Sequence, residues 1–109
     1  MIKLPIKAIS VNRAYQGRRF ATPELKKYKR DVALLLPPLQ IPKTGKLRAR
    51  YVFGVSSKAS DADNLVKGIQ DILAEVYGFN DKMIYRLEVE KVDVKQKGDE
   101  YIMFEIYSL

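Results

Sequence analysis

An alternating segment near the middle of the chain limits the folds that the sequence can adopt. Residues 46–56, KLRARYVFGVS, carry apolar side chains at every second position, with basic side chains between them at first. This alternation is typical of a β-strand with one buried face. Such a face must pack against another layer of secondary structure. The residues of the apolar face are Leu47, Ala49, Tyr51, Phe53 and Val55.

Two segments have the periodicity of amphipathic helices. The first begins at Thr22-Pro23-Glu24, because threonine caps a helix, proline fits its first position and glutamate favours its positive end. It ends before Pro37-Pro38. The second runs from about Asp61 to Val76, and Gly78 can end it. Its predicted buried stripe consists of Leu65, Ile69, Ile72, Leu73 and Val76.

Three further segments, residues 2–6, 83–95 and 100–107, have strand-like patterns. Lys97-Gly98-Asp99 predicts a hairpin turn between the last two, and a shift in apolar phase predicts a bulge near Glu90 or Lys91. The order of elements predicts a single α+β domain over residues 1–109. We expect a mixed sheet of about four strands, packed on one side by two helices.

Residue types that are missing from the sequence narrow its chemistry. The chain has no cysteine and no histidine, which excludes disulfides, thiolate nucleophiles, histidine bases and the usual zinc sites. Catalysis would need carboxylates, lysine, tyrosine, serine or a hard cation such as Mg²⁺ or Mn²⁺. Without a signal peptide or a long apolar run, we expect a cytoplasmic protein with no membrane partner. The net charge of +7 favours an anionic partner such as nucleic acid.

Acidic residues gather in DADNLVKGIQD, residues 61–71, although the chain is basic. Asp61 and Asp63 can simply interact with the positive end of the helix, and Lys67 can form an ordinary surface ion pair. Alternatively, the carboxylates bind Mg²⁺, which would activate water for attack on a phosphodiester while Lys67 neutralises the developing charge. Asp81 lies after the helix. It can join the others only if the next strand returns beside the helix start, or if a second subunit contributes.

The pattern Asp61-x-Asp63-Asn64-x-x-Lys67-x-x-x-Asp71, followed by Phe79-Asn80-Asp81, resembles the RusA family of Holliday-junction resolvases. The family turn usually carries two aspartates, so Asn80 is a departure, whereas Asp81 is retained. The segment Ser10-Val11-Asn12-Arg13-Ala14-Tyr15 is similar to the family's S-x-N-x-x-Y. Other similar positions are Thr22-Pro23-Glu24, Tyr28 and Lys91.

The resemblance implies a homodimeric crossover junction endodeoxyribonuclease of DNA recombination and repair. It would nick opposed strands of a four-way DNA junction with Mg²⁺, or with Mn²⁺ as a substitute, and without an organic cofactor. The metal-binding catalytic acids would be Asp61, Asp63 and Asp81. Lys67 would be the catalytic lysine, supported by Asn64 and by Asp71, which would hold Lys67 through i to i+4 pairing. The nucleic-acid contacts would be Asn12, Arg13, Tyr15, Arg18, Arg19, Lys58 and Lys91.

Two other functions fit the same residues. The chain could be a metal-dependent nuclease that acts on other branched nucleic acids, or a binding module that never cleaves. The acids argue against a pure binder, because carboxylates that face phosphate weaken binding. The basic strand face formed by Lys46, Arg48 and Arg50 fits either a DNA surface or a solvated sheet face.

Overall fold

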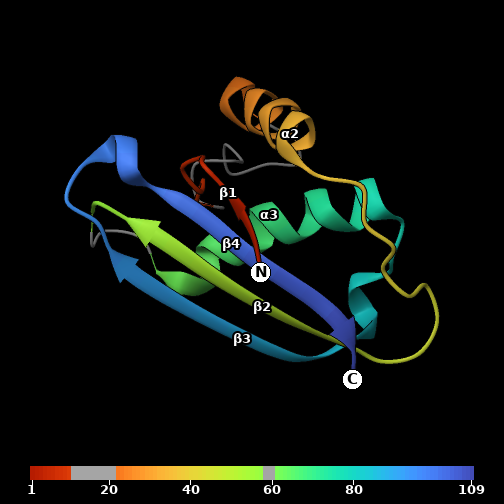
Figure 1. The fold of residues 1–109 in the computed structure, drawn as a ribbon. Coiled ribbons are helices and arrows are strands. Elements are labelled where there is room, and N and C mark those ends of the chain that lie inside the picture. The colour runs from red at the N-terminus through yellow and green to blue at the C-terminus, as the bar shows by residue number, and fades with distance from the viewer. Residues whose placement is uncertain (11–21, 58–60) are drawn as a thin grey trace.

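The computed structural model describes residues 1–10, 22–57 and 61–109. Its sheet has four strands in the order β1-β4-β2-β3 (Figure 1). β4 pairs antiparallel with β1 and with β2, whereas β3 runs parallel to β2. The sheet is therefore mixed, as predicted. The strands are β1 (Ile2–Leu4), β2 (Leu47–Val55), β3 (Ile84–Asp93) and β4 (Tyr101–Ser108).

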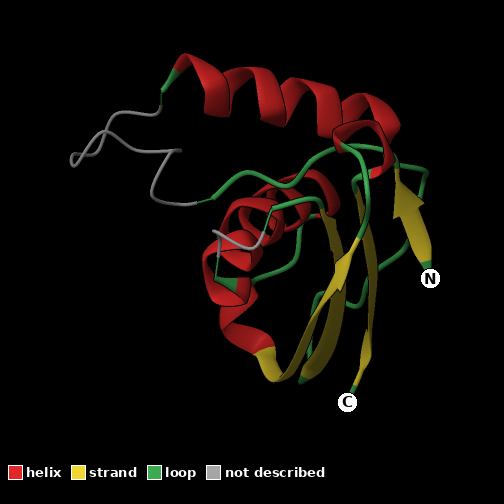
Figure 2. Ribbon diagram, turned by 90° about the vertical axis from the view of Figure 1, so that its left-hand side faces the viewer, coloured by secondary structure: helices red, strands yellow, loops and turns green. Residues whose placement is uncertain are grey.

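Both long helices, α2 (Pro23–Leu35) and α3 (Ala62–Tyr77), lie on one side of the sheet (Figure 2). α3 packs along the sheet, and α2 packs on α3 towards the edge formed by β1. This arrangement confirms the predicted α+β class. Because α3 connects two parallel neighbours, β2 and β3, its first turn lies near the ends of both strands. The acidic residues of that turn therefore lie at one end of the sheet.

The helix ends follow the expected capping chemistry. The Thr22 hydroxyl accepts a hydrogen bond from the Leu25 N–H at 3.2 Å, and Pro23 takes the first helical position. Asp61 precedes α3 as its N-cap with an extended backbone. Gly78 ends α3 in the left-handed region, at φ 73°, where a side chain would be strained.

The core lies between the sheet and α3. Tyr51 and Phe53 of β2 are completely buried, as their alternation predicts, and Ile69 of α3 packs in the same cluster. Val76 is an exception to the predicted stripe, because its side chain is 46% exposed. It lies in the last turn of α3. Helical periodicity identifies the buried face but does not show how far along the helix the covering layer extends.

The predicted hairpin between β3 and β4 is wrong. β2 lies between these two strands in the sheet, and Lys97–Asp99 forms a short 3-10 helix in the connection. Turn composition alone cannot distinguish a hairpin from a connection that passes over a neighbouring strand. β2 is instead a central strand, which pairs with β3 along one edge and with β4 along the other.

The predicted bulge lies elsewhere in β3. The register between β2 and β3 shifts between Leu47 and Arg48, where Tyr85 is the extra residue. Glu90 and Lys91 pair with β2 in continuous register, so the bulge is not near them. β3 is an edge strand whose residues are mostly exposed. Its apolar phase is therefore a poor guide to its backbone geometry.

Candidate active site

A groove of about 490 Å³ runs between α3 and β3. α3 contributes charged side chains to one wall, and β3 contributes apolar side chains to the other. Asp81 enters from the short 3-10 helix Asp81–Met83 that precedes β3. The groove thus brings a lysine and three carboxylates together on one side of α3. Its lining residues are Ala62, Asp63, Val66, Lys67, Gln70, Asp71, Asp81, Leu87 and Val89.

The charged residues of α3 follow one another at intervals of four along the groove. The Nζ atom of Lys67 lies 3.3 Å from Oδ2 of Asp71, which confirms the predicted pairing. Asp63 and Asp71 are about 12 Å apart along the helix axis, at about 1.5 Å per residue. Asp81 lies at the Asp71 end, because the two residues also share a second hollow. Lys67 therefore lies between two acidic ends of the groove.

Asp61 lies on the other side of the start of α3. Its side chain lines a separate cavity of about 710 Å³, bounded by α2, α3 and residues 6–10. Asn64 lines the same cavity, and its N–H donates to the Asp61 carbonyl at 3.2 Å. Asn64 therefore lies with Asp61 and not in the groove that contains Asp63 and Lys67. Because Asp61 precedes the helix, helical periodicity does not determine its direction.

The predicted acids do not form a closed cluster. No three Asp or Glu side chains lie close enough together to hold a metal ion within residues 1–10, 22–57 and 61–109. Asp61, Asp63 and Asp81 all belong to these ranges. β3 does run back beside α3, but Asp81 precedes this strand and lies at the far end of the groove from Asp63, so the return does not join it to Asp61 and Asp63. Mg²⁺ commonly binds through one or two carboxylates plus waters and substrate phosphates, so these oxygen donors still suit it.

A family model for the endodeoxyribonuclease RusA matches residues 7–103. The chain belongs to the RusA family. The matched residues include α2, α3 and every residue of the groove. A search of curated proteins found no match. The RusA match confirms the resemblance seen in the sequence and identifies the chain as a member of an endodeoxyribonuclease family.

Asn80, the departure from the usual RusA turn, has a clear structural role. Its Oδ1 accepts a hydrogen bond from the Lys82 N–H at 3.0 Å. This bond caps the 3-10 helix that carries Asp81. An aspartate can accept the same bond, because both side chains form such turns. The substitution therefore preserves the geometry of the turn while removing one negative charge.

A buried tyrosine beneath the groove was predicted only as a core residue. The Tyr51 hydroxyl donates to Oε1 of Gln70 at 3.1 Å. Burial raises the pKa of Tyr51, and the nearby carboxylates of Asp71 and Asp81 raise it further. The hydroxyl thus remains a neutral donor that orients Gln70 in the groove wall. Strand alternation predicts that Tyr51 is buried but cannot show what its hydroxyl contacts.

Most of the predicted nucleic-acid contacts lie outside the described residues. These are Asn12, Arg13, Tyr15, Arg18, Arg19 and Lys58. Lys91 is described, and it lies exposed on β3 opposite Phe53. By alternation it lies on the same face of β3 as Val89 of the groove wall. Within the described residues, no helix is long and apolar enough to cross a membrane.

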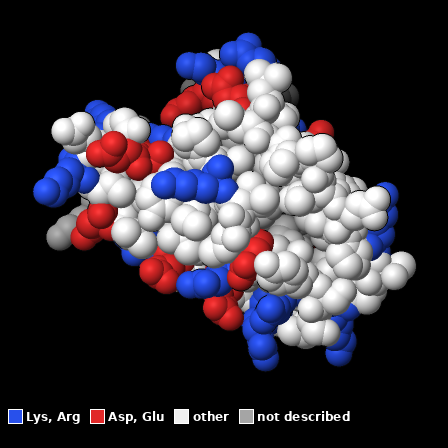
Figure 3. Space-filling model, viewed as in Figure 1, with Lys and Arg blue, Asp and Glu red and all other residues white. Residues whose placement is uncertain are grey.

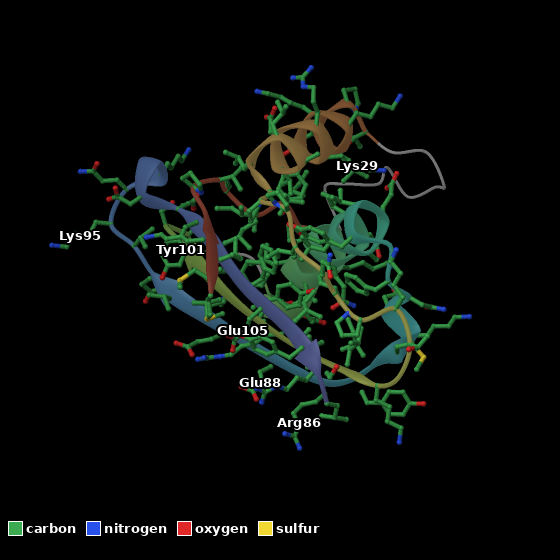
Figure 4. The ribbon with its side chains drawn as sticks, turned by 45° about the vertical axis from the view of Figure 1, so that its right-hand side comes forward. Lys29, Arg86, Glu88, Lys95, Tyr101 and Glu105 are labelled. Carbon is green, nitrogen blue, oxygen red and sulfur yellow. The ribbon has the colours of Figure 1, made fainter. Side chains whose placement is uncertain are left out.

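Neighbouring side chains balance the positive charge on the basic face of β2. Nitrogen atoms of the Arg50 guanidinium lie 3.7 Å from Glu88 and 3.6 Å from Glu90, and the Arg48 guanidinium covers the ring of Tyr107 at 5.2 Å. Glu88 lies on the side of the sheet away from the helices (Figure 4). Figure 3 shows basic and acidic side chains interspersed along the lower edge of the molecule. These contacts favour a solvated sheet face over a DNA surface.

Proposed function

We propose that the chain is a Mg²⁺-dependent endonuclease that resolves four-way DNA junctions by paired symmetric nicks in recombination and repair. The single observation that carries this proposal is the groove of a RusA-family chain, in which Lys67 lies between Asp63 and Asp81. Carboxylates in the wall of a groove repel DNA, whereas a protein of net charge +7 attracts it. A cation bound by the acids would remove this local repulsion, so that the groove could also bind DNA.

The proposed metal ligands are Asp61, Asp63 and Asp81, with Mn²⁺ as a substitute for Mg²⁺. Carboxylate oxygens are the donors that both ions prefer. Asp63 supplies donors at one end of the groove, Asp81 supplies them at the other, and Asp61 lies across the helix start. When bound to such acids, Mg²⁺ lowers the pKa of water and neutralises phosphate charge.

The side chains of the groove support the chemistry in distinct ways. The Lys67 ammonium can donate to a phosphate oxygen whose charge increases during attack. Asp71 holds that ammonium from the following turn of α3. Leu87 and Val89 form the apolar wall of the groove opposite these charges. Gln70, held by Tyr51, offers an amide group to the DNA backbone.

A junction presents two equivalent strands, so paired nicks require two active sites. We propose that a homodimer supplies them, one from each subunit. Sedimentation of the purified protein, alone and with a junction, tests this assignment directly. A dimer that binds one junction agrees with it, whereas a monomer that cuts both strands in independent encounters contradicts it.

The basic segment with Arg13, Arg18 and Arg19 is proposed to grip the DNA, together with Asn12, Tyr15, Lys58 and Lys91. Phosphate contacts release counterions, so each lost contact makes binding less dependent on salt. Replacing Arg18 and Arg19 together with alanine should weaken junction binding and reduce its salt slope by roughly two. An unchanged slope would exclude both arginines from the interface.

The first experiment is cleavage of an end-labelled four-way junction, with a matched linear duplex, a flap and a nicked duplex beside it. We expect Mg²⁺-dependent nicks at symmetric positions on opposed strands of the junction, with the duplex intact. Equal cutting of flaps and junctions would identify a nuclease of broader specificity. Binding without cleavage in Mg²⁺ or Mn²⁺ would identify a binding module.

The matched variant is Asp63→Asn, which removes one charge from the groove and conserves the side-chain volume. It should abolish nicking while junction binding persists. Glu105→Gln is the control, because Glu105 lies on β4 and its carboxylate accepts a hydrogen bond from Tyr107 on the open face of the sheet. If Asp63→Asn cut the junction at nearly the original rate, the assignment of Asp63 would be wrong.

A further inference from the structure

The outer edge of β3 is the longer of the two edges of the sheet in the part of the chain that the structure describes. β3 has ten residues, whereas β1, the strand at the opposite edge, has three and is followed by Pro5, which has no N–H to donate. Two large apolar side chains of β3, Tyr85 and Leu87, are 62% and 48% exposed. A long edge with exposed apolar side chains pairs readily with another strand, so native proteins usually protect it. This edge therefore indicates a partner strand.

The backbone of β3 is oriented for such a pairing. The Val94 N–H donates to the Val55 carbonyl at 2.8 Å, and the register between β2 and β3 is uninterrupted from Arg86 to Asp93. Successive residues of a strand direct their N–H and C=O groups to opposite sides, so the even-numbered residues of β3 face β2. Odd-numbered residues such as Leu87 therefore direct these groups away from β2, towards the open edge.

The side chains of β3 are self-complementary when the strand pairs antiparallel with its own copy about a two-fold axis perpendicular to the sheet. With the axis at Leu87, Arg86 of each subunit lies opposite Glu88 of the other, so two opposite-charge pairs flank a contact between the two Leu87 side chains. An axis at Glu88 would retain two such pairs, between Arg86 and Glu90, but would place the two Glu88 carboxylates opposite each other. An axis at Val89 would place Glu88 opposite Glu90 twice. Like charges in opposite positions are destabilising, so the charges favour the axis at Leu87.

We propose that β3 pairs antiparallel with β3 of a second copy of this chain, with the two-fold axis at Leu87, and that this contact is the interface of the homodimer. The inference rests on the homodimer of the proposed function and specifies where its subunits meet. The two sheets would join into one continuous sheet, with the helices of both subunits on the same side. The two grooves would then adjoin across the axis, with Leu87 and Val89 of both subunits between the two Lys67 side chains.

The first test uses the absence of cysteine from the chain, because a single engineered thiol can then report which residue lies at the axis. In a hydrogen-bonded antiparallel pair, the two Cα atoms are about 5.5 Å apart. This separation lies within the range of about 4.4–6.8 Å that a disulfide spans. Oxidation of full-length Leu87→Cys should therefore give a covalent dimer on a denaturing gel, and a reducing agent should reverse it.

Val89→Cys and Asp93→Cys are the matched controls on the same strand. With the axis at Leu87, the two Val89 positions lie about 13 Å apart along the strands and the two Asp93 positions about 40 Å apart, at about 3.3 Å per residue. We expect both variants to crosslink at least about tenfold more slowly than Leu87→Cys, because these separations exceed the reach of a disulfide. Equal crosslinking at all three positions would indicate random encounters and would overturn the inference.

The charge pairs provide a second test, by sedimentation equilibrium. Arg86→Glu replaces two attractive pairs with two repulsive ones, so the dissociation constant of the dimer should rise by about tenfold or more. Lys95→Glu makes the same charge change beyond the end of β3 and should leave the dissociation constant unaltered (Figure 4). An equal rise in both variants would reveal a general charge effect and would overturn the proposed pairing.

The remaining outcomes separate this inference from the proposed function. A protein that sediments as a dimer but does not crosslink through Leu87→Cys overturns the β3 interface and leaves the homodimer in place. A protein that sediments as a monomer, alone and with a junction, overturns both the interface and the homodimer. In either case, Mg²⁺-dependent nicking of the junction would still support the proposed endonuclease.

Discussion

Lys67 and Asp71 form an ion pair across one turn of α3, with 3.3 Å between Nζ and Oδ2. Their side chains are 60% and 41% exposed, so the pair contributes only about 0.3–0.5 kcal/mol to folding. The pair has a larger effect on where the Lys67 ammonium lies than on the stability of the fold. The pair holds the ammonium in the groove shared by Asp63 and Asp81.

Asp71→Asn should therefore reduce activity more than stability. We expect the single-turnover rate of junction nicking to fall by about tenfold, while the free energy of unfolding changes by less than about 0.5 kcal/mol. Lys67→Met should lower the rate by about 100-fold, because the groove would lose the donor that we propose for the phosphate. Glu75→Gln, one turn further along α3, is the control, since Glu75 pairs with Lys29 of α2 at 2.9 Å. An unaltered rate in Asp71→Asn would contradict a role in positioning.

The candidate site could be predicted in part because one helix carries most of it. A repeat of four residues puts Asp63, Lys67 and Asp71 in one row, so their shared groove follows from the sequence. The position of Asp81 depends on the parallel pairing of β2 and β3, which no local pattern shows. Asp61 lies before the helix, where the backbone is extended, so its direction could not be predicted from the helical repeat.

The fold shows the same division between local and long-range information. Buried faces of β2 and α3 follow from periodicity, whereas the partners of β3 and β4 do not. Glu100 is the clearest example. In the sequence it ends the polar run KGDE and resembles a surface residue. It is buried because β4 pairs with β2, which brings Ser56 to its carboxylate.

Gly54 provides a test of the packing on the open face of the sheet. A Cβ atom there would overlap with the ring of Tyr101, over which Lys3 lies at 4.5 Å. Gly54→Ala should destabilise the fold by about 1–3 kcal/mol, because the ring must move. Gly98→Ala should have a much smaller effect, since nothing lies within 4 Å of its Cβ position. Chemical denaturation measures both. A double variant that also contains Tyr101→Ala should recover part of the loss, and strict additivity would contradict the proposed overlap.

The turn that carries Asp81 can be tested through its cap. Asn80→Ala removes the acceptor for the Lys82 N–H and should allow the 3-10 helix to fray. We expect junction nicking to fall by about tenfold or more, with global stability lowered by only about 1 kcal/mol. Asn80→Asp conserves the acceptor and should remain close to the wild-type rate. If Asn80→Ala and Asn80→Asp both nicked the junction equally slowly, nicking would require the amide group of Asn80 and not the capping hydrogen bond.

The raised pKa of Tyr51 leads to a prediction of how the stability of the fold changes at alkaline pH. Its pKa in the folded protein is raised above the ordinary value of 10.0, so the folded state retains the proton that the unfolded state releases. The stabilisation is fully present below about pH 10 and is lost as pH rises further. At pH 8, Tyr51→Phe should cost about 1 kcal/mol through the lost hydrogen bond to Gln70. Above pH 10, the wild type should lose about 1.4 kcal/mol per pH unit relative to the variant.

Guanidinium titrations of both proteins from pH 8 to pH 11 measure this difference. Lysines and the other tyrosines titrate in both proteins, so their effects largely cancel in the comparison. The advantage of the wild type should shrink to nearly zero by about pH 11. A difference that stayed constant across this range would mean that Tyr51 ionises as readily in the folded protein as in the unfolded chain. In that case, burial and the carboxylates of Asp71 and Asp81 would not control its pKa.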